Sequence, residues 1–142
     1  MSNRTLGLDL DGAIRFTVFG TAVPQARPRA FRTGNGVRTY TPDKCTSWKN
    51  IIAYEAQRHV PPALLDCPLA IKATFFIFRP KSRRGKKDLY PDTKPDFDNL
   101  VKAVTDACEG LIYTNDSRIV SAVVEKQWGD PPRVEIEIRR ME

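Results

Sequence analysis

Residues 69–78 read LAIKATFFIF, a nearly continuous run of apolar and β-branched residues and the strongest strand pattern in the chain. Such a run is typical of a strand inside a sheet, because strands with one solvated face alternate apolar and polar residues. The chain has 142 residues, which is enough for one domain with a substantial hydrophobic core. We therefore expect a single domain organised around this strand.

The remaining patterns predict the other elements of the domain. Alternating and β-rich segments indicate strands at residues 14–20, 27–32, 37–41, 119–128 and 133–139. A Thr-Gly-Asn-Gly turn joins the second and third of these, which predicts a basic hairpin. Helical spacing indicates helices over residues 42–60 and from residue 97 or 98 to 109. The apolar stripe of the second helix is expected to comprise Phe97, Leu100, Val101, Val104, Cys108 and Leu111. The predicted fold class is α+β, a mixed β-sheet with two packed helices in the order β, basic hairpin, α, β, α, β, β.

Residues 1–13 are expected to be a flexible N-terminal segment before a domain over residues 14–142. The segment resembles the nucleophile motif of haloacid-dehalogenase-type phosphatases through Asp9 and Asp11. The later acidic pair that this phosphatase family needs is not found in the sequence. A small phosphatase remains an alternative function, and deletion of residues 1–12 would abolish its activity.

The cellular context is indicated by what the composition lacks. The three cysteines are far apart and form no CxxC pair, which favours free thiols in a reducing cytoplasm over disulfides or a zinc site. The N-terminus has no secretory signal pattern, and no apolar run approaches the roughly 18 residues of a membrane span. We expect a cytoplasmic protein with no membrane partner.

The charge is unevenly distributed along the chain. The formal net charge is +6, but residues 24–44 carry +4, residues 79–94 carry +5, and residues 95–142 carry −4. Two basic segments followed by an acidic last third of the chain are consistent with a protein that binds a polyanion on one surface and has carboxylates nearby. A solvated surface with uneven charge is the alternative.

The basic side chains of the hairpin and of the 79–94 segment are the candidate DNA contacts. The candidates are Arg27, Arg29, Arg32, Arg38, Lys81, Arg83, Arg84, Lys86 and Lys87. Aromatic residues are interleaved with the hairpin arginines, as in surfaces that contact phosphates and sugars. The Pro, Gly and charge content of residues 79–94 predicts a mobile loop that DNA binding would order.

The acidic segment before the second helix carries the candidate chemistry. Asp96 and Asp98 are one residue apart, and Asp116 lies in the loop before the next strand. Mg²⁺ prefers carboxylate oxygens, so three such groups in one place could hold one or two metal ions. The metal would lower the pKa of a bound water and polarise a phosphate. Lys102, one helical turn after Asp98, would place a positive charge near the transition state.

Each of these residues also has a structural interpretation. Asp98 and Lys102 have the spacing of a surface ion pair, and Asp96 could be a loop acid before a capped helix. His59, the single histidine, has no second metal ligand at a suitable spacing, so we predict a surface residue near the helix end and not a general base.

At the acidic segment the chain resembles the RusA-type Holliday junction resolvases, a family common in phages and prophages. The resemblance lies in the sequences DFDNLVK at residues 96–102, DACEGLIY at 106–113 and NDSRIV at 115–120. It extends through the final strand pair, including Glu125 and Lys126, and is weaker in the hairpin. The resemblance implies a homodimeric endodeoxyribonuclease that cuts four-way DNA junctions with Mg²⁺ or Mn²⁺ in recombination and repair. It implies that Asp96, Asp98 and Asp116 bind metal and that Lys102 is catalytic.

One departure from the family pattern is Asn115, where some relatives have a further aspartate. The resemblance also implies action in a bacterial host cell, on the nucleoid when DNA is bound. A module that binds branched DNA without cutting it is the second functional alternative.

Overall fold

The computed structural model describes residues 11–24, 29–33, 36–40, 43–84 and 89–141, with the backbone alone for residues 29–33, 36–40 and 43–45. The strands are β1 (Ile14–Phe19), β2 (Arg29–Thr33), β3 (Gly36–Tyr40), β4 (Leu69–Ile77), β5 (Ile119–Trp128) and β6 (Arg133–Arg140). The helices are α1 (Asp43–Ala56) and α2 (Phe97–Cys108), with short 3-10 turns η2 (Gln57–His59), η3 (Lys81–Arg83) and η4 (Asp116–Arg118). The predicted α+β class and element order are confirmed.

The main sheet has four strands in the order β1-β6-β4-β5. Strand β4 pairs antiparallel with β6 and parallel with β5, so the sheet is mixed and β4 is an interior strand, as predicted. Strand β1 pairs antiparallel with β6 and forms one edge. A parallel pair needs a crossover connection, and here α2 supplies it between β4 and β5.

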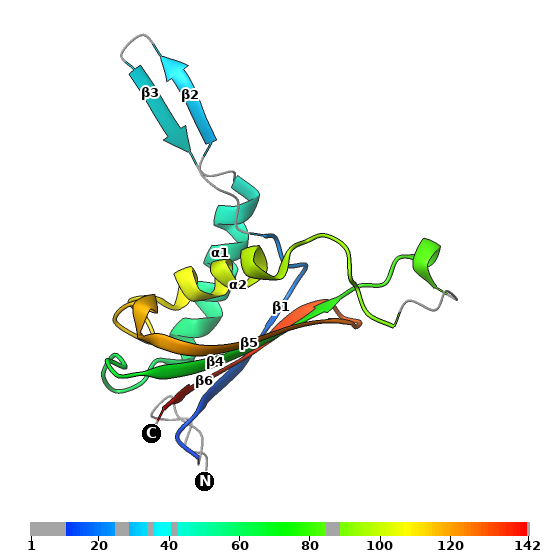
Figure 1. Cartoon of the computed structure of the whole chain (residues 1–142). Helices are drawn as coiled ribbons and strands as arrows, with labels where there is room; N and C mark the ends of the chain where they lie inside the picture. Colours follow the sequence, from blue (N-terminus) through cyan, green and yellow to red (C-terminus); the bar gives the residue numbers. More distant parts are fainter. Residues whose placement is uncertain (1–10, 25–28, 34–35, 41–42, 85–88, 142) are drawn as a thin grey trace.

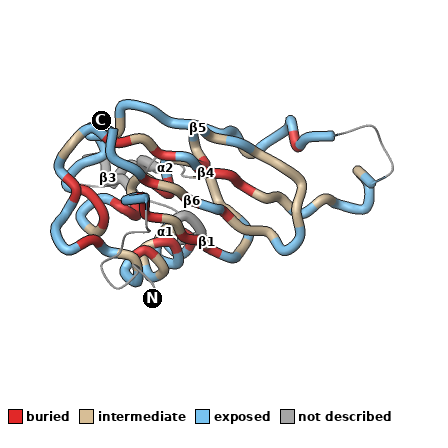
Figure 2. Tube along the Cα trace, turned by 90° about the horizontal axis from the view of Figure 1, so that it is seen from below, coloured by how far each residue is buried: buried red, intermediate tan, exposed pale blue. Residues whose placement is uncertain are grey.

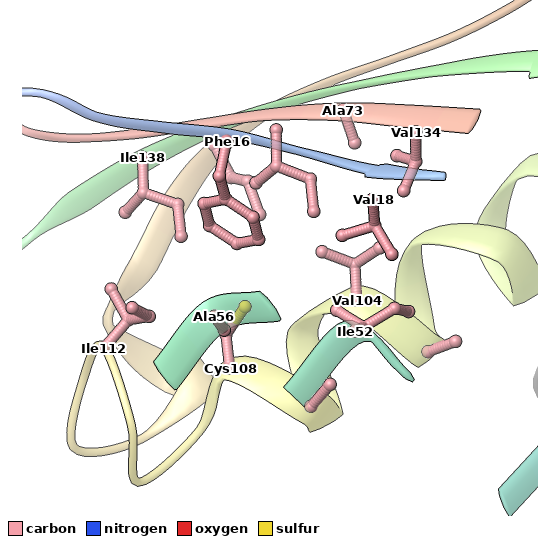
Figure 3. Packing of buried hydrophobic residues seen from close by; sticks show 14 of the residues in the cluster. Phe16, Val18, Ile52, Ala56, Ala73, Val104, Cys108, Ile112, Val134 and Ile138 are labelled. Carbon is pink, nitrogen blue, oxygen red and sulfur yellow. The ribbon is translucent and has the colours of Figure 1, made fainter. Parts of the chain in front are cut away.

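Both helices pack on one face of this sheet (Figure 1). Alternate residues of β1 point into the core, and Phe16 and Val18 lie over buried side chains of the two helices (Figure 3). From α1 the core receives Ile52 and Ala56, and from α2 it receives Leu100, Ala103, Val104, Ala107 and Cys108. This packing fixes α2 along the sheet.

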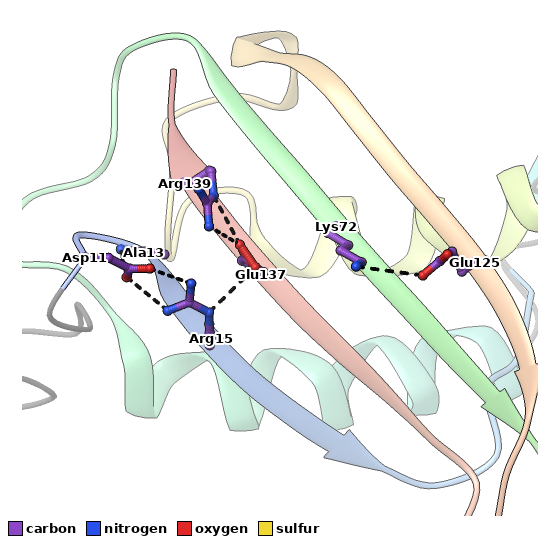
Figure 4. Close-up of polar contacts among 7 residues, drawn as sticks. All are labelled: Asp11, Ala13, Arg15, Lys72, Glu125, Glu137 and Arg139. Atoms are coloured by element: carbon purple, nitrogen blue, oxygen red, sulfur yellow. Dashed lines mark hydrogen bonds and ion pairs between the residues drawn. The ribbon is translucent and has the colours of Figure 1, made fainter. Parts of the chain in front are cut away.

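The other face of the sheet is polar. Figure 4 shows Arg15 between Asp11 and Glu137, and Lys72 beside Glu125 on the neighbouring strand. Cross-strand pairs of opposite charge stabilise a solvated sheet face. Figure 2 shows the alternation of buried and exposed positions that results along the strands.

Strands β2 and β3 form a separate two-stranded sheet. This hairpin projects from the body of the domain, next to the beginning of α1 (Figure 1). An isolated two-stranded hairpin is only marginally stable in water. A hairpin that projects from the domain is in a position to contact a binding partner. The predicted hairpin is confirmed.

Three further expectations can be compared with the described residues. Cys67 and Cys108 are free thiols, as predicted, whereas the side chain of Cys45 lies outside the described part. Within the described residues, no helix is long and apolar enough to cross a membrane. The 79–94 segment contains the short turn η3, and its residues 85–88 lie outside the described ranges.

Candidate metal centre and nucleic-acid interface

Two carboxylates lie at the beginning of α2. Asp96 is the N-cap residue: its backbone is extended, with φ −72° and ψ 141°, and its carbonyl accepts a hydrogen bond from Leu100 N at 3.1 Å. Asp98 lies in the first turn, and its Oδ1 accepts from Asn99 N at 2.9 Å. Asp96 occupies the N-cap position, but its side chain makes no capping hydrogen bond. The positive end of the helix dipole favours both negative charges.

Lys126 of β5 holds the segment that leads into α2. Its Nζ donates to the carbonyl oxygens of Thr93 at 2.7 Å and Pro95 at 2.9 Å. The backbone immediately before Asp96 is therefore fastened to the sheet by a half-buried ammonium group. Sequence reasoning noted Lys126 only as part of the resemblance. The sequence does carry a sign of this role, because Lys126 is a charged residue at a helix-facing position of the strand, where the neighbouring helix-facing residues are apolar.

Lys102 lies on the exposed side of α2 and turns toward the helix end. Its Nζ is 3.5 Å from Oδ2 of Asp106. The ion pair of Lys102 is thus with the acid four residues later, and not with Asp98 as the structural interpretation proposed.

A second group of carboxylates lies at the end of α2. Glu109 Oε1 accepts a hydrogen bond from Asp116 N at 3.0 Å, which ties the turn η4 to the helix end. Asn115 caps this turn, because its Oδ1 accepts from Ser117 N at 2.8 Å. Asn115 thus has a local structural role that does not require a metal.

Tyr113 is buried beneath this second group. Its hydroxyl donates to Thr105 O at 2.6 Å. The pKa of Tyr113 is raised, first by burial and then by electrostatic interaction with Cys108, Asp116, Glu109 and Asp106. These electrostatic interactions indicate that Asp106, Glu109 and Asp116 all lie near Tyr113.

The two groups of carboxylates are separated by the length of the helix. Asp98 and Glu109 are eleven positions apart, or about 16 Å at the rise of an α-helix. Among the described residues, which include all three candidate aspartates, no group of three or more His, Cys, Asp or Glu side chains lies close enough to hold a metal ion. The carboxylates are chemically suited to Mg²⁺. Their arrangement in this single chain does not fit one three-carboxylate site.

The candidate DNA-binding residues are only partly described. Lys81 and Arg83 lie in η3 and Arg84 follows it. Arg29, Arg32 and Arg38 are placed by backbone on the projecting hairpin. Arg27, Lys86 and Lys87 lie outside the described residues, so their predicted roles stay predictions.

A surface depression of about 560 Å³ is lined by residues of β1, β4, β6 and the end of α1, and by none of α2. His59 borders it, with Nε2 at 2.9 Å from Glu55 and its ring stacked on Phe16. His59 is near the helix end, as expected, but it is half-buried and not a plain surface residue. The carboxylate of Asp11 is held by Arg15 and Ala13, so its described contacts give no support to a phosphatase nucleophile.

Two comparisons with known proteins bear on this site. The sequence model of a family described as "Endodeoxyribonuclease RusA" matches residues 20–139, which includes both carboxylate groups, Lys102 and Lys126. The chain is also similar to the Bacillus subtilis (strain 168) protein named "Uncharacterized protein YqaN". The two are 37% identical over 137 residues, covering 90% of this chain and 96% of that relative.

Proposed function

The chain belongs to the RusA endodeoxyribonuclease family, and we propose that it cuts four-way DNA junctions in recombination and repair, as a homodimer that requires Mg²⁺. We expect Mn²⁺ to support the same cleavage in place of Mg²⁺. The observation that carries the proposal is the carboxylate pair Asp96 and Asp98 at the beginning of α2, held on the sheet through Lys126. The pair lies within the segment that the family match covers.

Asp96 and Asp98 have the properties that a divalent-cation site requires. Both are exposed to solvent, so a hydrated cation with an attached phosphate can approach them. Asp96 has one ion pair, with Lys94 at 3.7 Å, and exposed pairs of this kind contribute little stability. A bound Mg²⁺ would supply an activated water and stabilise charge on the phosphate.

Lys102 and Asp116 complete the proposed centre. We assign Lys102 the role of a positive charge that stabilises the developing negative charge on the phosphate. Its pair with Asp106 is more than half exposed on the lysine side, so the ammonium group can leave Asp106 at small cost. Asp116 stays a proposed third metal ligand, although in this single chain it lies with Glu109 at the other end of α2.

A homodimer suits the substrate. A four-way junction has two-fold symmetry, and a two-fold dimer presents two cutting centres to opposing strands. The basic hairpin and the basic 79–94 segment would hold the phosphates, so junction affinity should fall steeply with salt.

The direct test is Asp98→Asn on a synthetic four-way junction with Mg²⁺. The substitution removes one metal-binding charge and keeps the side-chain shape. We expect cleavage to fall by about 100-fold or more, while the dissociation constant for the junction changes by less than about threefold. Glu125→Gln is the matched control, because it removes one exposed carboxylate charge on the opposite face of the sheet and should leave cleavage unchanged.

A DNA-binding module without nuclease activity is the second candidate. The separation of the two carboxylate groups in the single chain favours it. It predicts that the wild-type protein binds the junction and releases no cleavage product with Mg²⁺ or Mn²⁺. Product from the wild type and none from Asp98→Asn would exclude it.

A further inference from the structure

Two arginines lie over one tryptophan at the end of β5. The guanidinium carbon of Arg79 is 5.5 Å from the ring centroid of Trp128, and that of Arg83 is 5.6 Å from it. Next to them, Arg84 lies 5.4 Å from the ring centroid of Phe78. Arginine stacks on aromatic faces by cation–π attraction, which fixes the plane of the guanidinium group.

The cluster and the segment that leads to the carboxylate pair both contact the same face of β5. Lys126 is paired with Phe75 and Trp128 with Ile77, so both point to the helix-bearing face of the sheet. The two side chains are two residues apart on one strand, or about 7 Å. Because Lys126 binds the carbonyls of Thr93 and Pro95, one face of β5 carries both the Trp128 cluster and the contact that holds the backbone before Asp96.

The backbone of the basic segment reinforces this placement. Arg83 N donates to Pro80 O at 2.9 Å, and Arg79 Nε donates to Arg83 O at 3.0 Å. These bonds hold the two arginines on the same short turn. A planar guanidinium group with a fixed orientation binds phosphate through two parallel hydrogen bonds at low entropic cost.

The acidic neighbour of the cluster is weakly bound. Asp92 Oδ1 is 3.5 Å from Arg83 Nη2, and the Asp92 side chain is 79% exposed. The Arg83 side chain is only 24% exposed, but the carboxylate is in solvent and at the long end of the ion-pair range, so a phosphate with higher charge density can replace it.

We propose that Trp128, Arg79 and Arg83 form a binding site for the sugar-phosphate backbone of a DNA strand, and that this site brings the strand to Asp96 and Asp98. The proposal rests on the proposed function and adds the place where the strand enters. Because guanidinium groups cover the tryptophan ring, the contact is to phosphates and has no base preference. Trp128 is then a positioning residue for the two arginines.

The experiment measures binding of a fluorescent four-way junction without divalent metal, over a series of salt concentrations. The double variant Arg79→Gln/Arg83→Gln should bind at least about tenfold more weakly. Its slope of log affinity against log salt should be smaller by about 1.8, the value for two lost phosphate contacts. Arg139→Gln removes one arginine that pairs with Glu137 on the opposite face, and should change the affinity less than about twofold.

The Trp128 variants distinguish the effect of ring stacking from the effect of side-chain size. Trp128→Phe keeps an aromatic face and should bind within about twofold of wild type, whereas Trp128→Leu should bind about fivefold more weakly. If Trp128→Leu melts below the assay temperature, the arginine double variant and Trp128→Phe decide the question.

The outcomes for the cluster and for the proposed function are distinct. If the double variant keeps the wild-type slope and affinity while Asp98→Asn still abolishes cleavage, the phosphate site is wrong and the nuclease proposal stands. If the wild type neither binds nor cuts the junction, both are overturned.

Discussion

Lys126 sets the position of the carboxylate pair through two hydrogen bonds to backbone carbonyls. The contact is indirect, because the ammonium group binds the residues before Asp96 and not the carboxylates. Hydrogen bonds from a charged donor are stronger than neutral ones and impose a definite geometry. A loss of this anchor would leave the pair present but displaced, and a displacement of 1 Å in a catalytic site can cost about 100-fold in rate.

Lys126→Met tests this role at the level of one side chain. It keeps the aliphatic stem and removes the three donors, so we expect junction cleavage to fall by about 10- to 100-fold, with the junction dissociation constant within about threefold of wild type. Lys126→Arg can still donate to both carbonyls and should retain more activity. Lys72→Met is the control, because Lys72 lies on the opposite face in an exposed pair. Equal cleavage by the Lys126→Met and Lys72→Met proteins would contradict the anchor.

The buried thiol of Cys108 makes the free energy of unfolding depend on pH in the alkaline range. Burial raises the pKa of its thiol from 9.0 to about 12. Between these values the unfolded chain loses a proton that the folded protein keeps, so the free energy of unfolding falls as pH rises, by about 1.4 kcal/mol per pH unit. Urea denaturation from about pH 9 to about pH 10 should therefore show a flatter pH dependence for Cys108→Ala than for the wild type. Equal slopes for the two proteins would show that Cys108 is not buried as described.

Helix α2 is the element that positions the whole site. It has 12 residues, begins at the carboxylate pair, carries Lys102 near its middle and ends at the second acid group. Its buried stripe includes Leu100, Val104 and Cys108, and Figure 3 shows Val104 and Cys108 on the side that faces the sheet. The Lys102 side is therefore left in solvent. The orientation of the site thus follows from apolar burial on the opposite side of the same helix.

The apolar stripe of α2 gives a paired prediction. Phe97 and Leu100 both fit the stripe expected from the sequence, but Leu100 is fully buried and Phe97 is 59% exposed. Leu100→Ala should lower the free energy of unfolding by about 2–5 kcal/mol, through the cavity that it leaves. Phe97→Ala should lower it by less than about 1 kcal/mol in the same urea titration. Similar losses for the two variants would contradict this packing of the helix.

At the scale of elements, the sequence predicted most of the fold. Period-two and period-3.6 patterns placed the strands and helices close to their observed ends, because burial on one face imposes those periods. Phe97 was misplaced because residues at a helix beginning can fit the period without having a partner to cover them. Tyr113 was missed as a core residue because it lies in a connection, where no periodic pattern reports burial.

For the candidate site, the sequence predicted the residue types better than their arrangement. The pair at Asp96 and Asp98 follows from local spacing, since both flank one helix beginning. The position of Asp116 depends on the directions of α2 and β5 in space. The spacing of residues along the sequence gives no information on these directions. The link between Lys126 and the segment before Asp96 spans more than thirty positions, so it too required the structure.

At the scale of the whole molecule, charge is arranged along the end of the sheet where β4 and β5 finish. The basic turn η3 and the arginines on Trp128 lie at this end, beyond the beginning of α2 (Figure 1). Positive charge before residue 95 and negative charge after it thus occupy two regions that the chain around residues 89–96 connects. A strand of DNA held by the first would pass the carboxylates of the second.

The most direct test of this account is the anomalous scattering of Mn²⁺ in crystals soaked with that ion. The account predicts a peak at coordination distance, about 2.0–2.6 Å, from carboxylate oxygens of both Asp96 and Asp98. A peak confined to Asp106, Glu109 and Asp116, or no peak at all at Mn²⁺ concentrations that support cleavage, would contradict it.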